Sequence, residues 1–303
     1  MSPPVAHVGA VFAPLELFPL ALAAVLYAKR SVTLARRGRP VPVWRQVCFA
    51  AGLLTVVAAL VSPIGHISEE LIIGHMAEHL MLGDIATLLI ALGLTGPLLQ
   101  PVLAVPVLSP LRVLAHPLVA FPLWAANLFF WHIPPLYDAA YAGAPIHAVE
   151  HTSFIFFGIL VWMPVFGPLP KPAWFTAAWK VVYVIVFRFT GAILGNILMW
   201  SGTLLYTEYA AGQAYWGIDP LTDQSTAGVI MMLEGTFLAL GLLAWVFFEA
   251  AREGIEKQRL LDLARDRGVA LDAERAQRAV AAGQGARLER ELTAAGRDPD
   301  PAA

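Results

Sequence analysis

The chain has very little cysteine and few charged residues. Its single cysteine, Cys48, excludes an intramolecular disulfide framework and a metal site built from several cysteines. Charged residues make up 14% of the 303 residues, against roughly 25% in soluble domains. Apolar residues make up 58%, and the mean hydropathy is +0.66. One soluble core could not bury so much apolar surface, so we predict that most of the chain lies in a lipid bilayer.

Basic residues are concentrated at the C-terminal end. Ten of the 20 Lys and Arg residues lie between Arg252 and Arg297, and ten of the 22 acidic residues lie in the same tail, residues 251–303. The remaining ten basic residues, spread over 250 positions, exclude a nucleic-acid interface there. We therefore predict a membrane domain at 1–250 and a nearly neutral, partly helical cytoplasmic tail at 251–303, helical at first and frayed after Gly283.

Seven apolar stretches of about 17–25 residues have the length that a bilayer requires. They predict an all-α membrane protein, a bundle of about seven transmembrane helices. No Lys or Arg precedes Lys29, so the first stretch is expected to be a retained helix and not a cleaved signal peptide. Pro97–Pro117 is apolar but interrupted by prolines, and is expected to be a kinked interfacial segment. The seven stretches lie near 11–28, 45–63, 71–93, 115–133, 148–167, 179–201 and 226–249.

Lys and Arg predict the orientation, because they are enriched in cytoplasmic loops. The third and fifth loops hold Arg112 and Lys171, while the N-terminus and the second, fourth and sixth loops hold no Lys or Arg. The N-terminus is therefore predicted outside and the C-terminus in the cytoplasm. The first loop holds six basic residues: Lys29, Arg30, Arg36, Arg37, Arg39 and Arg45.

Histidines gather on the predicted outer side. His75 and His79 are spaced i,i+4, as are His147 and His151, which places two imidazoles on one face of each helix. Imidazole suits copper, zinc, iron and nickel, so two such pairs on one side of the membrane favour a metal or cofactor site. Only His116 is predicted to be cytoplasmic: His7 lies on the outer N-terminal segment, and six more histidines lie at the outer surface or in the outer leaflet, His66, His75, His79, His132, His147 and His151.

Each histidine pair also contains a glutamate, Glu78 or Glu150. The form H-x-x-E-H is the inverted zincin pattern, with two metal ligands and a general base. Two copies at a membrane surface, with no soluble catalytic domain, fit a metalloprotease poorly. The glutamates are instead expected to hydrogen-bond the imidazoles. Four methionines fall at similar depth, Met76, Met199, Met231 and Met232; thioether sulfur favours Cu(I), but packing is the favoured interpretation.

Charged residues inside the apolar stretches are expected to face the interior of the bundle, because a charge in the bilayer costs several kcal/mol. Arg188 lies near the middle of the sixth stretch, with Asp84 or Glu234 as its expected partner. Gly191 and Gly195 form a G-x-x-x-G face that allows close helix packing.

A long motif follows the fourth stretch: Trp131-His132-Ile133-Pro134-Pro135-Leu136-Tyr137-Asp138-Ala139-Ala140. It is accompanied by Gly74-His75-Met76 with His79, Gly93 and Pro97, His147 with Glu150-His151, Trp216-Gly217, Asp219-Pro220-Leu221, Asp223-Gln224 and Ala227-Gly228. Together these residues make the sequence resemble the caa3-type cytochrome c oxidase assembly factor family, the Bacillus-type CtaG proteins, over roughly residues 11–250.

The resemblance implies a multi-pass protein of the bacterial cytoplasmic (inner) membrane that is needed to assemble haem-copper oxidases, with cytochrome c oxidase subunits as partners and no enzyme activity of its own. Such oxidases need copper near the outer side of the membrane. We therefore predict one copper ion bound at the outer face by His75, His79, His147 and His151, with His132 as a further contributor. Zinc fits the same donors. Three alternatives stay open: a metal-free scaffold, a copper transporter and a b-haem redox protein.

Overall fold

A computed structural model describes residues 14–108, 110–172, 174–281 and 283–295, and all regular structure in these residues is helical. The chain divides into two compact units, one of Met1–Phe175 with Val182–Leu238 and one of Thr176–Val181 with Ala239–Ala303. The predicted all-α membrane fold is confirmed, while the number of spans and the orientation stay predictions.

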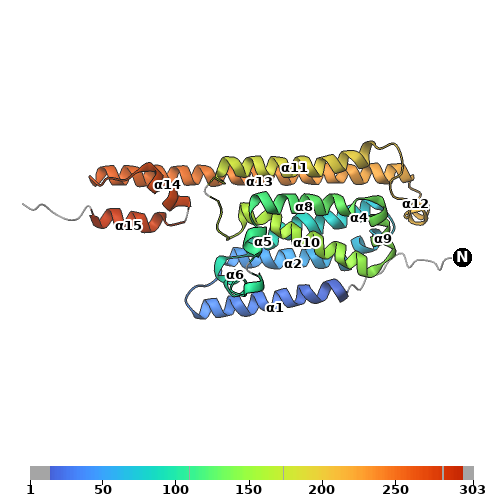
Figure 1. The fold of residues 1–303 in the computed structure, drawn as a ribbon, viewed down its shortest axis with the longest axis horizontal. Coiled ribbons are helices and arrows are strands. Elements are labelled where there is room, and N and C mark those ends of the chain that lie inside the picture. Colours follow the sequence, from blue (N-terminus) through green and yellow to red (C-terminus); the bar gives the residue numbers. More distant parts are fainter. Residues whose placement is uncertain (1–13, 109, 173, 282, 296–303) are drawn as a thin grey trace, which may run out of the picture. The chain divides into compact units, whose positions relative to one another are not determined.

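The first unit contains most of the helices (Figure 1). Helices α11 (Ala177–Trp200) and α13 (Pro220–Asp266) each contribute residues to both units. The other elements of the first unit are α1 (Pro14–Arg36), α2 (Val43–Val61), α3 (Pro63–Ile67), α4 (Ile72–Leu80), the π-helix η1 (Met81–Ala86), α5 (Thr87–Gly93), α6 (Gly96–Leu103), the 3-10 helix η2 (Pro106–Leu108), α7 (Leu111–Leu114), α8 (Pro117–Trp131), α9 (Pro134–Ala142), α10 (Ala144–Phe166) and α12 (Ala210–Trp216).

Every predicted apolar stretch contains helix. Within the described residues, six helical segments are long and apolar enough to cross a membrane, whereas α8, in the fourth stretch, has only 15 residues. The first stretch continues as helix to Arg36, so Lys29 and Arg30 belong to α1 and not to a loop. Long basic side chains tolerate this position because their heads reach water while their stems cover apolar surface, and the end of a helix favours positive charge.

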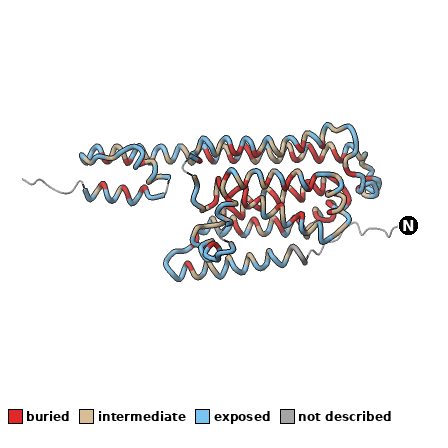
Figure 2. The backbone as a smooth tube through the Cα atoms, viewed as in Figure 1, coloured by how far each residue is buried: buried red, intermediate tan, exposed pale blue. Residues whose placement is uncertain are grey.

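Burial separates inner helices from outer ones. In the span formed by α4, η1 and α5, and again in α10, 56% of the residues in the most apolar window are buried, against 6% in α1 and 17% in α13 (Figure 2). The exposed side chains of α1 and α13 include large apolar ones such as Phe18, Leu26, Leu233 and Phe237. Apolar surface of this extent is typical of helices that face lipid.

Close backbone contacts hold α10 against the span that contains η1. A Cβ atom added to Gly158 of α10 would collide with the Gly83 carbonyl oxygen and lie 2.8 Å from Oγ1 of Thr87. The Thr87 hydroxyl donates to the Gly83 carbonyl and accepts a hydrogen bond of 3.2 Å from the indole of Trp162. The polar groups freed by the π-helix are thus satisfied within the bundle, as the bilayer interior requires.

The predicted G-x-x-x-G face is used at one of its two glycines. Gly195 of α11 packs against α13, where a Cβ on Gly228 would lie 2.5 Å from the Gly195 carbonyl oxygen. A Cβ on Gly191 would meet nothing within 4 Å. Close packing therefore requires glycine at 228, leaves little room at 195, where a Cβ would lie 3.1 Å from the Gly228 carbonyl oxygen, and does not require glycine at 191.

The predicted interfacial segment Pro97–Pro117 consists of the short helices α6, η2 and α7. It follows α5, whose last carbonyl groups are bound by a basic side chain: Arg45 donates to the carbonyl oxygens of Leu92 and Leu94 at 2.9 and 2.8 Å. Arginine there satisfies acceptors that a helix end leaves unpaired.

The second unit contains the end of α13 together with α14 (Ala273–Ala281) and α15 (Gly285–Ala295). Leu260, Ala264, Leu288 and Leu292 form its buried apolar cluster, and Arg259 pairs with Glu289 at 2.5 Å. The prediction of a tail frayed after Gly283 is wrong, because the apolar face of α15 is buried in this cluster. The boundary at residue 250 and the cytoplasmic location of the tail stay predictions.

Orientation can be tested by cysteine labelling in a Cys48→Ser background. We expect Ala142→Cys, exposed at the end of α9, to react with a membrane-impermeant maleimide in intact cells. Pro40→Cys, exposed between α1 and α2, should react only after the membrane is opened. The physical reason is the cytoplasmic preference of the basic loops. The reverse pattern would overturn the predicted topology.

The glycine contacts predict opposite effects for two alanine substitutions. Gly158→Ala should lower the stability of the detergent-solubilised protein by about 1–3 kcal/mol, because the added methyl group overpacks the contact with η1. Gly191→Ala, the matched control, should leave stability unchanged or raise it by up to about 1 kcal/mol, since alanine is the better helix former. Thermal unfolding measures both, and equal melting temperatures would contradict the proposed packing.

Candidate metal centre

Two parallel sets of side chains from α4 and α10 form the site. His75 and His79 lie three and seven residues after the first residue of α4, Ile72, and His147 and His151 lie at the same offsets from Ala144 in α10. Ring centroids are 4.1 Å apart for His75 and His79, and 4.0 Å apart for His147 and His151. The i,i+4 spacing therefore stacks each pair along one helix face, as the sequence predicts.

The two pairs face each other across the helix interface. The His75 and His147 rings are 5.9 Å apart and the His79 and His151 rings 5.5 Å apart, so the arrangement approximates a two-fold axis between the helices. His75, His79 and His151 are buried, and His147 is half-buried. Four of the five predicted ligands are thus brought together.

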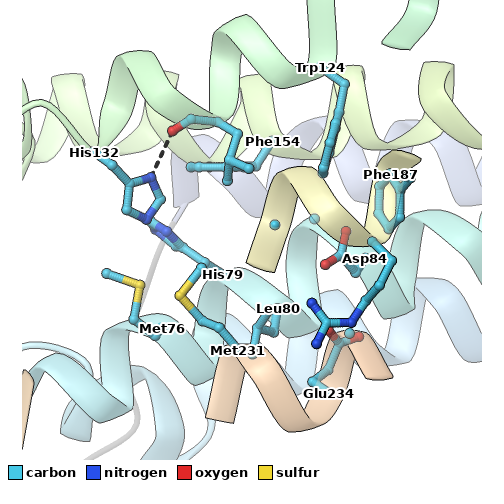
Figure 3. Close-up of a pocket in the computed structure, with 15 residues that line it drawn as sticks. Met76, His79, Leu80, Asp84, Trp124, His132, Phe154, Phe187, Met231 and Glu234 are labelled. Carbon is cyan, nitrogen blue, oxygen red and sulfur yellow. Dashed lines mark hydrogen bonds between the residues drawn. The ribbon is translucent and has the colours of Figure 1, made fainter. Parts of the chain in front are cut away.

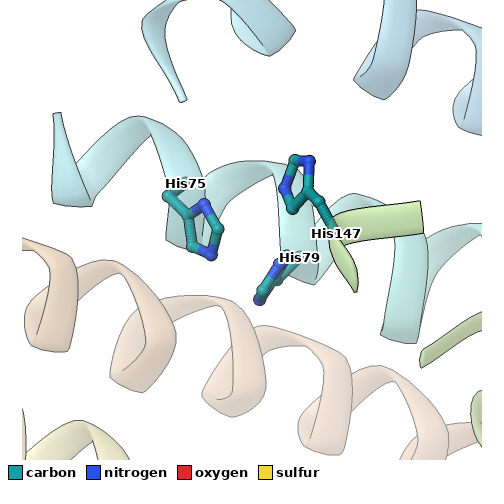
Figure 4. Close-up of side chains that lie close together, drawn as sticks. All are labelled: His75, His79 and His147. Carbon is teal, nitrogen blue, oxygen red and sulfur yellow. The ribbon is translucent and has the colours of Figure 1, made fainter. Parts of the chain in front are cut away.

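The ring nitrogens are spaced closely enough for shared ligation. One nitrogen from each of His75, His79 and His147 lies within 4.8 Å of the others (Figure 4). Two nitrogens bound to one metal at about 2.0–2.1 Å are at most about 4.2 Å apart. Small side-chain rotations therefore suffice to close three imidazoles around one ion.

The glutamates connect the two helices crosswise. Glu150 of α10 has an oxygen 3.7 Å from Nε2 of His79, and Glu78 of α4 has an oxygen 3.9 Å from Nε2 of His151. These distances suit ion pairs but exceed hydrogen-bond length, so the expected Glu–His hydrogen bonds are not formed in these pairs. Glu78 also lies within 4.8 Å of His147 and His151, which makes it a further potential ligand that the sequence analysis did not assign.

Several buried ring nitrogens lack hydrogen bonds to the described residues. They include Nε2 of His75 and both nitrogens of His79. A buried polar atom without a partner costs roughly 1–3 kcal/mol, so three in one cluster need an explanation. Each neutral ring has a lone pair on one nitrogen, so a metal ion would accept one lone pair from His75 and one from His79 and lower that cost; the donor set of imidazoles with nearby carboxylates fits copper or zinc.

His132 lies apart from the four-histidine cluster. It follows the end of α8, and its ring is 6.2 Å from that of His79. Nδ1 lies 2.7 Å from the carbonyl oxygen of Leu128. His132 belongs to neither of the two sets of ligand atoms that lie within 4.8 Å of one another, the set of His75, His79 and His147 and the set of Glu78, His147 and His151. Its role as a further ligand of the same ion stays a prediction.

Three buried tyrosines lie beside the cluster. The Tyr137 ring is 4.9 Å from that of His75 and stacks on Tyr206 at 3.8 Å, and its hydroxyl is 2.7 Å from that of Tyr209. Tyr206 donates to the carbonyl oxygen of His132 at 2.9 Å. Burial raises the pKa of Tyr137 and Tyr209 well above the usual value, which favours the neutral phenol at both positions.

A cavity of about 50 Å³ continues from His79 into the bundle (Figure 3). Asp84, Arg188 and Glu234 line its far end. The Arg188 guanidinium donates to the Met232 carbonyl oxygen at 3.0 Å and to Oγ1 of Thr236 at 2.8 Å. The charged residues predicted to face the bundle interior therefore share one cavity, and the first contacts of Arg188 are neutral acceptors on α13.

Asp223 positions the helix that carries His75 and His79. Its carboxylate, buried at the start of α13, accepts hydrogen bonds from the backbone N–H groups of Ile72 and Ile73 at 2.9 and 3.0 Å. It also accepts one from the Gln213 side chain at 2.9 Å. Leu71, which precedes α4, provides no side-chain cap. An aspartate some 150 residues away therefore caps α4, a role that sequence spacing could not reveal.

The neighbouring residue, Gln224, holds the loop that precedes Tyr206 and Tyr209 in the chain. Its side-chain oxygen accepts from the Leu205 N–H at 2.7 Å, and its nitrogen donates to Oγ of Ser201 and the Thr203 carbonyl oxygen. Asp223 thus fixes the start of α4, and its neighbour Gln224 fixes the loop that leads to Tyr206 and Tyr209.

These features define a helical membrane protein with a buried histidine–glutamate cluster between two of its spans. The family model described as cytochrome c oxidase caa3 assembly factor (Caa3_CtaG) matches residues 25–253, which include both histidine pairs and Asp223. The chain belongs to this family, and the resemblance found in the sequence is confirmed. Comparison with curated proteins found no match. Comparison with solved structures also found none.

The Asp223 cap predicts a large effect from one substitution. Asp223→Ala should destabilise the protein by roughly 1–3 kcal/mol for each buried donor left unpaired, and should weaken metal binding by releasing the start of α4. Asp219→Ala is the control, because Asp219 is an exposed cap of Thr222 and its loss should cost about 1 kcal/mol. Thermal unfolding and metal content measure the difference. Equal losses would argue against a special role for Asp223.

Proposed function

We propose that this assembly factor holds copper in the cluster of His75, His79, His147 and His151 and makes it available to subunits of the oxidase. The observation that carries the proposal is the set of buried, unpartnered ring nitrogens of His75 and His79 beside His147, all within reach of one ion. Copper is cargo in this proposal, and the chain catalyses no reaction on it.

The donor set of this site consists of nitrogen and oxygen atoms and is compatible with copper. Imidazole nitrogens and carboxylate oxygens bind copper and zinc, and metal identity in the cell depends on supply as well as on affinity. Cys48 lies in α2 and belongs to neither group of closely spaced ligand atoms, so the cluster has no thiolate donor among the described residues. The crosswise glutamates can hold the rings in register and offset positive charge that a bound ion brings.

An outer-face location follows from the predicted topology. Both histidine pairs occur in the first two turns of their helices, and these helices begin on the side without basic loops. Copper held there would lie on the side where a haem-copper oxidase receives it. We extend the proposal accordingly to a multi-pass protein of the bacterial cytoplasmic membrane that works beside cytochrome c oxidase subunits.

A double substitution tests the proposal. We expect His79→Ala with His151→Ala to lose copper while remaining folded and inserted, because it removes one ligand from each helix. His116→Ala is the control, since His116 accepts a hydrogen bond from Leu118 N–H at the start of α8, away from the cluster. Copper content of the purified proteins and oxidase activity in a strain that lacks the native chain are the measurements.

The control should keep both copper and oxidase activity, and the double variant should lose both. Full copper content and full oxidase activity in the double variant would show that the histidines serve packing. The metal-free scaffold would then replace the proposal.

A further inference from the structure

The cavity beside His79 has a second set of potential ligands on its near side. Met76 and His79 come from α4, His132 follows α8, and Met231 comes from α13. All four line the same cavity, and Figure 3 shows them at one end of it, with Asp84 and Glu234 at the other. None of the other three histidines of the cluster lines this cavity.

The hydrogen bond of His132 prepares its other nitrogen for a metal. Because a carbonyl oxygen can only accept, Nδ1 carries the proton that it donates to Leu128. Nε2 therefore holds a free lone pair, and this atom is buried without a hydrogen bond to any described residue. A backbone carbonyl bound to one ring nitrogen, with the other directed to the metal, is the usual arrangement of a histidine ligand.

The two sulfur atoms make this position chemically different from the four-histidine cluster. Met76 is 1% exposed and Met231 is 9% exposed, so both thioethers are shielded from water. The remaining wall is largely apolar, with Leu80, Leu128 and Phe154. Neighbouring Met232 does not line the cavity, and its sulfur instead lies 3.4 Å from the amide nitrogen of Asn196. Thioether donors in a dry site favour Cu(I) over Cu(II) and zinc.

The available space suits an ion. The cavity volume of about 50 Å³ exceeds the roughly 10–15 Å³ that one water-sized probe occupies. Methionine side chains have three rotatable bonds and adapt to irregular gaps, so two sulfurs can approach an ion without movement of the helices.

We propose that Met76, His79, His132 and Met231 form a second metal position that is selective for Cu(I). The reading of this position as a stage in copper delivery depends on the proposed function above. His79 belongs to both positions, with two buried nitrogens that lack hydrogen bonds. A copper ion that moves between the four-histidine cluster and the sulfur-containing position can therefore keep His79 as a ligand while its other donors are exchanged.

The test separates the two positions with conservative variants. Met76→Leu with Met231→Leu removes both sulfurs at nearly constant volume and should leave the fold intact. Met232→Leu is the matched control, and His75→Ala with His147→Ala disables the four-histidine cluster but keeps His79. Each full-length protein in detergent is loaded anaerobically with Cu(I) in competition with a Cu(I) chelator, and separately with Zn(II). X-ray absorption at the copper edge then reports sulfur in the coordination shell.

We expect copper–sulfur scattering in the wild type, in the Met232 control and in the His75/His147 variant. The Met76/Met231 variant should lose that scattering. Its Cu(I) affinity should fall by about 10–100-fold or more, since the loss of an outer-shell partner alone costs that much. Its Zn(II) affinity should stay within a few-fold of the wild type. Thermal unfolding of the same samples confirms that the variants are folded.

Failure of this inference and failure of the proposed function give different results. Copper bound by the wild type with nitrogen and oxygen neighbours alone, or unchanged Cu(I) affinity in the Met76/Met231 variant, would overturn the sulfur-containing position and leave the four-histidine cluster in place. A wild-type protein that binds no copper in either test would overturn both.

Discussion

The carboxylate of Asp223 is the interaction on which the arrangement of the site depends. It binds the first backbone N–H groups of α4 and so fixes where that helix begins. His75 and His79 lie in the two turns that follow, so a shift of one residue at the start of α4 would rotate both rings by about 100° away from α10. The same carboxylate accepts a hydrogen bond from Gln213, which ties the segment before α13 to the start of α4. In a bilayer such a buried charge is costly unless several donors satisfy it, and here three do.

The second constraint is the closeness of α10 to the span that contains α4 and η1. Gly158 leaves room for the Gly83 carbonyl group, which lies in the π-helix between Met81 and Ala86 and accepts a hydrogen bond from the Thr87 hydroxyl. Because the helices approach so closely there, the two His-x-x-Glu-His segments meet in register near the starts of α4 and α10. Each glutamate then reaches a histidine of the opposite helix. The resulting cluster contains ring nitrogens and carboxylate oxygens from both helices, and His79 also lines the cavity that Met76 of α4 and Met231 of α13 share.

Much of the site could be predicted from local sequence, because i,i+4 spacing in a helix puts two side chains on one face whatever surrounds them. The pairing of His75 with His79 and of His147 with His151 was predictable for that reason. The position of His132, outside the four-histidine cluster and in the wall of the cavity beside His79, could not be predicted, since it depends on where α8 ends relative to α4. The glutamates were expected to contact imidazoles, but which histidine each one approaches is decided only when the helices are packed. Met76 and Met231 were interpreted as packing residues because methionine is a common filler of membrane helices, and their spacing does not place them with His79 and His132.

The sequence by itself determined that this is a membrane protein, approximately where its helices lie, and the family to which it belongs. Hydropathy and charge scarcity act over whole segments, and a ten-residue motif is specific without any knowledge of contacts. Tertiary structure alone decided which residues meet: Asp223 with the start of α4, Gly158 with Gly83, and His79 with two different sets of donors. Most of these contacts join positions about 50 to 150 residues apart. They depend on how the side chains of neighbouring helices interlock, and the period of a single helix carries no information about its neighbour.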